Sequence, residues 1–176
     1  MVEIHARGRF GGDRVIVTHM AKAIRAKVGD VFRIPISTDQ YVLGQVVKKV
    51  RAQHMVVTFR AANASIDDAI ASGIELAGIV FDAKLRNGDW PIVENRPPVE
   101  VKDPWFALGH EGLENLRLTN FDDSEVRLVS PSEASKHRHR NLSGPMVLQR
   151  AVAALHGNDS WQSDFDHFRD LASEVS

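Results

Sequence analysis

Residues 28–60 read VGDVFRIPISTDQYVLGQVVKKVRAQHMVVTFR and contain three apolar runs: VFRIPI at 31–36, YVLGQVV at 41–47 and HMVVTF at 54–59. Valine, isoleucine and aromatic side chains pack well on a pleated sheet, so each run favours a strand. The polar link STDQ at 37–40 has a length common in hairpin loops. The stretch therefore predicts an antiparallel meander around which the rest of the chain packs.

Two residues of this meander restrict its shape. Proline cannot donate a ladder hydrogen bond, so the first strand should lie at a sheet edge or end at Pro35. Gly44 lies inside the second run, where glycine marks a bend, a bulge or a close backbone approach. We favour a bend over a ligand approach at Gly44. Together the two residues predict a curled sheet or a small, partly open barrel.

Later segments extend the sheet and then turn helical. Ser65–Gly73 predicts a short helix, with a serine cap, early acids and a glycine stop. Pro91 places the strand at 90–93 on an edge. Further strands are expected at 74–85, 105–109, 113–118 and 125–129, so that one antiparallel sheet runs from about residue 31 to residue 129.

Helices are expected after Ser130, which is followed by proline at the first helical position. Apolar residues at helical spacing form one stripe within 147–155 and another within 161–172. The predicted fold class is α+β: a curled antiparallel β-sheet or partly open barrel with C-terminal helices packed on it.

The size of the chain, 176 residues, favours a single domain. We divide it into a lead-in segment at 1–26, a β-rich domain with a C-terminal helix at 27–157, and an acidic amphipathic helix at 158–176. Cysteine is absent, which excludes disulfides and thiolate metal sites. The sequence has no apolar run long enough to span a membrane and no signal peptide. We therefore expect a soluble cytoplasmic protein.

The net charge of −1 conceals two unlike halves. Residues 1–60 hold eleven Lys and Arg against four acids, a balance of +7, and the remainder holds eleven against nineteen, a balance of −8. Two readings stand side by side. The halves form oppositely charged faces, or they interleave in space and attract each other.

A search for catalytic motifs finds no phosphate loop, dinucleotide fingerprint, zinc-protease pair or serine elbow. The basic run Lys136–Arg140 is the best local candidate, as a solvated helix end, a phosphate or nucleic-acid site, or a metal site at His137 and His139. We favour the solvated helix end, because histidines two apart lie on different sides of a helix. We expect no catalytic residues, no metal site and no cofactor.

Three segments resemble the immunity protein 26 family. They are Gly29–Ile36 with Tyr41–Val46, Asn87–Val93 with its Gly-x-Trp motif, and Ala154–Gly157 at a helix end. The resemblance covers roughly 27–157. It implies a bacterial cytoplasmic antidote, encoded beside a polymorphic toxin, that binds its cognate toxin without catalysis. The alternative is a small β-barrel nucleic-acid-binding protein or hydrolase that uses the basic N-terminal half.

The partner implied by the resemblance is a toxin protein. We expect neither a membrane nor nucleic acid as partner, and the oligomeric state stays open. Toxins that attack nucleic acid need basic clefts, and acids on an antidote speed encounter with such a cleft. The acids are densest in 94–125 and 159–174. We expect a contact surface flanked by Glu111, Glu114, Asp122 and Asp123, with Trp105 as anchor. The opposite choice is a basic binding side with Lys48, Lys49 and Arg51.

Overall fold

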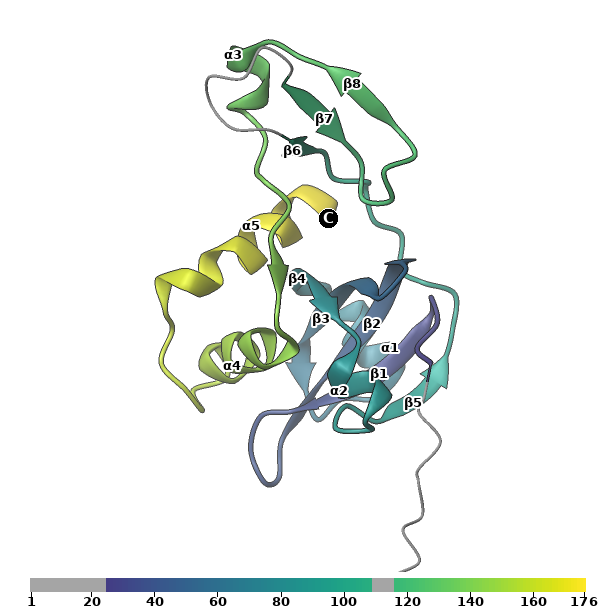
Figure 1. The fold of residues 1–176 in the computed structure, drawn as a ribbon. Helices are drawn as coiled ribbons and strands as arrows, with labels where there is room; N and C mark the ends of the chain where they lie inside the picture. Colours follow the sequence, from purple (N-terminus) through teal and green to yellow (C-terminus); the bar gives the residue numbers. More distant parts are fainter. Residues whose placement is uncertain (1–24, 109–115) are drawn as a thin grey trace, which may run out of the picture.

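The computed structural model describes residues 25–108 and 116–176. Its centre is a six-stranded sheet in the order β5-β1-β2-β3-β4-β9 (Figure 1). The strands are β1 Asp30–Pro35, β2 Tyr41–Val50, β3 Gln53–Ala62, β4 Ile74–Phe81, β5 Ile92–Asn95 and β9 Leu142–Ser143. The predicted meander is confirmed as β1, β2 and β3. The class is α+β, and the sheet stays open between its edges β5 and β9 rather than closing into a barrel.

The sheet is mixed, whereas the sequence predicted only antiparallel pairing. β9 runs parallel to β4, with Ile79 opposite Leu142 and Val80 opposite Ser143. The chain returns to β9 only after it has built a second sheet, and such a long connection permits a parallel strand.

β1 ends at Pro35, as predicted.

Gly44 makes room for the core. The register between β2 and β3 shifts at this point, and a side chain at Gly44 would lie 2.8 Å from the ring of Phe32. That ring stacks on buried Trp90 with centroids 5.4 Å apart. The irregular pairing and close approach agree with the sheet bend that the sequence favoured.

A second, smaller sheet replaces the expected continuation of the first. It contains β6 Phe106–Leu108, β7 Arg117–Thr119 and β8 Val126–Leu128, in that order. The connection before it contains Pro97, Pro98 and Pro104, and proline resists addition to a sheet interior. Figure 1 shows this sheet beyond α5, at one end of the molecule.

Helices follow the predicted caps. α1 Ile66–Ala71 and α3 Pro131–Ala134 begin after serines that accept a backbone N–H. The strand expected at 74–85 ends at Phe81, because α2 Ala83–Arg86 takes up its last part. α4 Pro145–Leu155 and α5 Asp166–Val175, with a 3-10 turn at Ser163–Phe165, complete the chain. Within the described residues, no helix combines the length and apolar character needed to cross a bilayer.

The large sheet buries both of its faces. α4, Trp90 and Phe165 pack with one face, while Phe106, Phe121 and the end of α5 pack with the other. Phe168 of α5 lies over Gly78 of β4, where a side chain would approach the ring to 2.9 Å. Of the apolar stripe predicted within 161–172, Phe165 and Phe168 are buried, whereas Trp161 is only half-buried. The end of α5 therefore joins the large sheet to the smaller one.

Candidate functional site

The predicted contact residues fall on the small sheet and its approaches. Trp105 precedes β6 and is half-buried, with the guanidinium of Arg127 4.8 Å from its ring centre. Asp122 and Asp123 are exposed on the turn between β7 and β8. Glu111 and Glu114 lie outside the described residues. The fold thus places Trp105 and the two aspartates on one small sheet.

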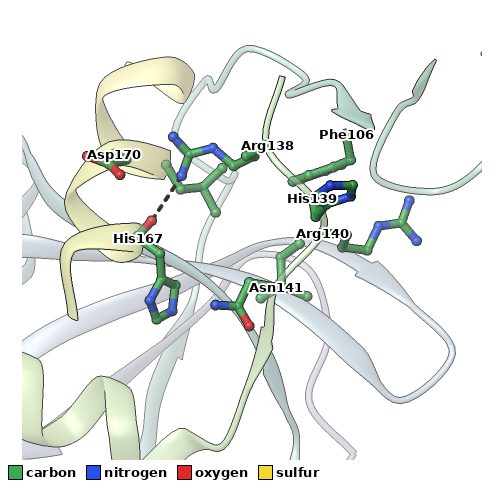
Figure 2. A pocket seen from close by; sticks show the side chains of 9 residues that line it. Phe106, Arg138, His139, Arg140, Asn141, His167 and Asp170 are labelled. Carbon is green, nitrogen blue, oxygen red and sulfur yellow. Dashed lines mark hydrogen bonds between the residues drawn. The ribbon is translucent and has the colours of Figure 1, made fainter. Parts of the chain in front are cut away.

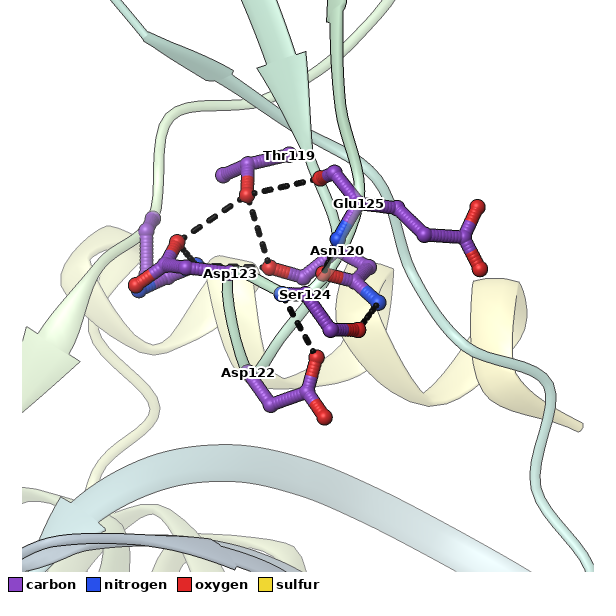
Figure 3. A network of polar contacts seen from close by, with 7 residues as sticks. Thr119, Asn120, Asp122, Asp123, Ser124 and Glu125 are labelled. Carbon is purple, nitrogen blue, oxygen red and sulfur yellow. Dashed lines mark hydrogen bonds and ion pairs between the residues drawn. The ribbon is translucent and has the colours of Figure 1, made fainter.

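A hydrogen-bond network fixes the β7–β8 turn (Figure 3). Asp122 accepts from the backbone N–H of Ser124 at 3.0 Å. The Asn120 side chain accepts from the N–H of Glu125 at 3.2 Å and donates to the Ser124 hydroxyl at 2.9 Å. The hydrogen bond with Ser124 lowers the pKa of the Asp122 carboxyl, which keeps it ionised. The turn is therefore a built structure with a fixed negative charge.

Asp123 has an internal partner as well. Arg140 donates to both of its carboxylate oxygens, at 2.7 and 3.2 Å, and to the carbonyl of Asn120 at 2.7 Å. The Thr119 hydroxyl donates to the same carboxylate at 3.0 Å. The hydrogen bonds from Arg140 lower the pKa of Asp123. The two predicted acids therefore differ, because Asp123 is neutralised in place and Asp122 is not.

A cleft of about 390 Å³ lies where the segment 138–141 passes between β6 and α5 (Figure 2). Arg138 lines it but donates to one oxygen of Glu174 at 2.7 and 2.9 Å and to the carbonyl of His167 at 3.1 Å. Arg140 lines it too, and pairs with Asp123. Both guanidinium charges are balanced inside the protein, which gives the cleft little excess charge for a phosphate.

The other residues of the predicted basic run also lie close to acids or to the backbone. Lys136 and His137 lie 4.0 and 3.9 Å from the carboxylate of Glu133. His139 Nδ1 lies 3.0 Å from the carbonyl oxygen of Ala107. Over residues 25–108 and 116–176, no group of three metal-ligating side chains is close enough to hold an ion. The run is a strap that follows α3 and ties the two sheets together.

Ser143 and His167 form an arrangement that resembles a nucleophile and its base. The Ser143 hydroxyl lies 2.9 Å from His167 Nε2, and His167 Nδ1 lies 2.6 Å from the carbonyl oxygen of Asp164. A carbonyl only accepts, so Nδ1 carries the proton and Nε2 accepts from the serine. Burial lowers the pKa of His167 and favours this neutral form. Ser143, however, is buried within β9 and does not line the cleft. The pair fastens α5 to β9.

Two of the three residues of the basic alternative surface also have partners within the protein. Lys48 Nζ lies 3.0 Å from Asp103, and Lys49 Nζ donates to the carbonyl of Ala26 at 2.6 Å. Arg51 is exposed on the β2–β3 turn, where its φ is 55°. The Lys48–Asp103 pair joins the basic first half to the acidic second half, so the two halves interleave at this point.

The outer edge of β8 was missed by sequence reasoning, which expected 125–129 to continue the large sheet. Val126 is 53% exposed and Leu128 is 69% exposed. Alternating apolar residues at 126 and 128 predict a buried face, but both side chains are exposed, and their strand is the last of the small sheet.

Comparison with known proteins supports a family assignment for the first part of the described chain. Residues 27–111 match the model of a family described as immunity protein 26. The match contains β1 through β6, and ends well before the limit of 157 that the motifs implied. A search of curated proteins and a search of solved structures each gave no match. The resemblance is confirmed for the motifs at 29–46 and 87–93, because both lie within residues 27–111, which match the immunity protein 26 family model.

Proposed function

We propose that the protein is a non-enzymatic immunity protein that binds and neutralises a cognate toxin in the bacterial cytoplasm. The family match over 27–111 is the observation that carries this proposal. The side-chain geometry is in keeping with it. Ser143 is buried and does not line the cleft, and the arginines of the cleft are paired with acids. Binding, rather than chemistry, is the role that these residues suit.

The proposed contact surface is the acidic end of the small sheet. Asp122 supplies a fixed, exposed charge at the turn, and Trp105 supplies an aromatic surface backed by Arg127. Glu111 and Glu114 remain part of this proposal because they lie between β6 and β7 in the sequence. Asp123 contributes by holding the turn in place, since Arg140 balances its charge. Exposed charges of this kind act mainly on the association rate.

The function is tested by co-expression with the toxin encoded by the adjacent gene. Expression of the protein should restore growth of cells that produce this toxin, and the two proteins should co-elute from a sizing column. Growth arrest that persists, together with separate elution, would refute the proposal.

The surface is tested by single charge reversals in that same complex. Asp122→Lys should slow association, and more so at low salt, because surface charges are screened at high salt. Arg51→Glu, on the β2–β3 turn of the basic alternative, is the matched reversal and should leave association unchanged. The opposite pattern would place the toxin on the basic side.

A further inference from the structure

The outer edge of β8 has unpaired backbone groups whose direction follows from the ladder. The N–H of Asn120 donates to the carbonyl of Glu125, and the N–H of Val129 donates to the carbonyl of Leu116. Residues 125, 127 and 129 therefore bond toward β7. In an antiparallel pair the direction alternates, so the N–H and C=O groups of Val126 and Leu128 point away from the sheet. Within the described part of the chain, these N–H and C=O groups have no backbone hydrogen-bond partner.

The side chains beside these groups are apolar and open. Leu128 is 69% exposed, more than any other large apolar side chain in the described residues, and Val126 is 53% exposed. They lie on one face of the sheet, in the rows that contain Thr119 and Arg117. Proteins usually protect such an edge with a charge, a proline or a cover. β8 thus offers both hydrogen-bonding groups and apolar contacts to an added strand.

A second copy of the chain fits this edge poorly. Two β8 strands paired antiparallel about their middle residue would place Arg127 opposite Arg127 of the other copy. Like charges directly opposite are destabilising. The acidic turn of one copy would meet Val129–Pro131 of the other, where no basic residue lies. Charge therefore argues for a different partner.

We propose that β8 binds the cognate toxin by accepting an extended strand of it along this edge. The proposal rests on the proposed function and names how the partner is held. The toxin strand forms backbone hydrogen bonds with Val126 and Leu128, in the mode of strand addition. It places apolar side chains against those of the same two residues.

The acidic residues at the start of β8 indicate which residues the toxin strand has at one of its ends. Asp122 and Glu125 are exposed at the start of β8, and in Figure 3 the Glu125 carboxylate points away from the turn network. A Lys or Arg at the matching end of the toxin strand complements them. At the other end, Ser130 and Pro131 begin α3 and limit the edge. The occupant is thus a short strand with alternate apolar residues and a basic end.

The first test is amide hydrogen exchange, measured on the free protein and on its complex with the toxin of the adjacent gene. The amides of Val126 and Leu128 should exchange rapidly in the free protein and become protected in the complex. Unchanged exchange at both amides in a complex that forms would overturn the proposal while leaving the proposed function intact. Failure of the unaltered protein to bind that toxin would overturn both.

The second test uses variants of the edge. Val126→Pro removes an outward N–H and leaves the ladder to β7 untouched, and Leu128→Lys adds a charge at an exposed position. Each should weaken toxin binding roughly tenfold or more, because a bond and apolar contacts are lost. Leu108→Lys is the matched control: Leu108 is 39% exposed on β6, at the opposite edge of the same sheet.

The controls separate the other outcomes. The thermal transition of each variant should stay close to that of the unaltered protein, which shows that lost binding is not lost folding. If Leu108→Lys weakens binding as much as Leu128→Lys, the toxin contacts the sheet face, and strand addition is refuted. If protection at 126 and 128 rises with protein concentration in the absence of toxin, the occupant is a second copy, and the proposal is overturned.

Discussion

Asp123 and Arg140 form a two-point ion pair, with carboxylate oxygens 2.7 and 3.2 Å from guanidinium nitrogens. The pair joins the β7–β8 turn to the strap that runs from α3 to β9. Arg140 also lies 5.3 Å from the ring centre of buried Phe106. Arg140 therefore helps buried Phe121 to hold the turn that begins β8 against the rest of the protein.

Removal of this pair should loosen the small sheet. Asp123→Asn and Arg140→Gln should each lower the stability by about 1 kcal/mol, since the carboxylate is largely exposed and surface pairs contribute little. The double variant should lose less than the sum of the two single variants. Thermal unfolding of the four proteins measures this coupling. Additive losses would show that the pair contributes nothing.

The same pair gives a pH dependence with a defined sign. The folded pKa of Asp123 is lowered from its ordinary value of 3.8. Its contribution is therefore complete above that value and is lost as the pH falls through the lower folded pKa. Acid unfolding of Asp123→Asn should lack this part of the pH dependence, whereas Glu125→Gln, which removes a nearby exposed charge, should retain it.

Phe165 should be a strong determinant of stability. The side chain is 1% exposed and packs with α4 on one face of the large sheet. Phe165→Ala should cost about 3–5 kcal/mol, which corresponds to roughly 6–20 °C in the melting temperature for a chain of this size. Leu128→Ala removes an exposed apolar side chain and serves as control. Equal melting temperatures for the two variants would contradict the packing.

Gly44 should tolerate no side chain. A Cβ there would lie 2.8 Å from the ring of Phe32 and 2.9 Å from the carbonyl oxygen of Val57. Gly44→Ala should therefore destabilise the protein by about 1–3 kcal/mol through overpacking. The control is Gly144→Ser, because no atom lies within 4 Å of a Cβ at Gly144 and serine suits the cap of α4. Similar denaturant midpoints for both variants would contradict this account.

His54 should make the protein less stable below neutral pH. It is fully buried in β3, and burial, followed by the charge of Lys49, lowers its pKa below 6.5, against an opposing effect of Asp82. The unfolded chain then binds the proton more readily than the folded one. The contribution is complete above pH 6.5 and is lost as the pH falls below it.

The measurement for His54 is chemical unfolding between pH 8 and pH 5, compared with His54→Leu. The variant should show a smaller fall in the free energy of unfolding toward pH 5. His167, whose pKa is also lowered by burial, accounts for part of the fall that remains. A fall of unchanged size would show that His54 binds a proton equally readily in the folded and the unfolded states.

Much of the fold could be predicted because local patterns and burial agreed. The apolar runs correctly predicted β1, β2 and β3, and the serine caps correctly predicted where α1 and α3 begin. The periodic apolar stripe gave the buried face of α4. The end of β4 was misplaced, since apolar residues continue beyond Phe81 at Ala83 and Leu85, and apolar character alone does not separate a strand from a helix.

By itself the sequence determined the α+β class, the central meander and the likeness to the immunity protein 26 family, because these depend on residues adjacent in the chain. Only the tertiary structure decided that Asp123 is balanced by Arg140 while Asp122 is not, and that β8 ends a separate sheet with an open edge. The physical reason is that ion pairing and strand pairing join residues distant in sequence. Thus residues 126 and 128 have the alternation of a buried strand, but their side chains are exposed and their strand lies at the end of the small sheet.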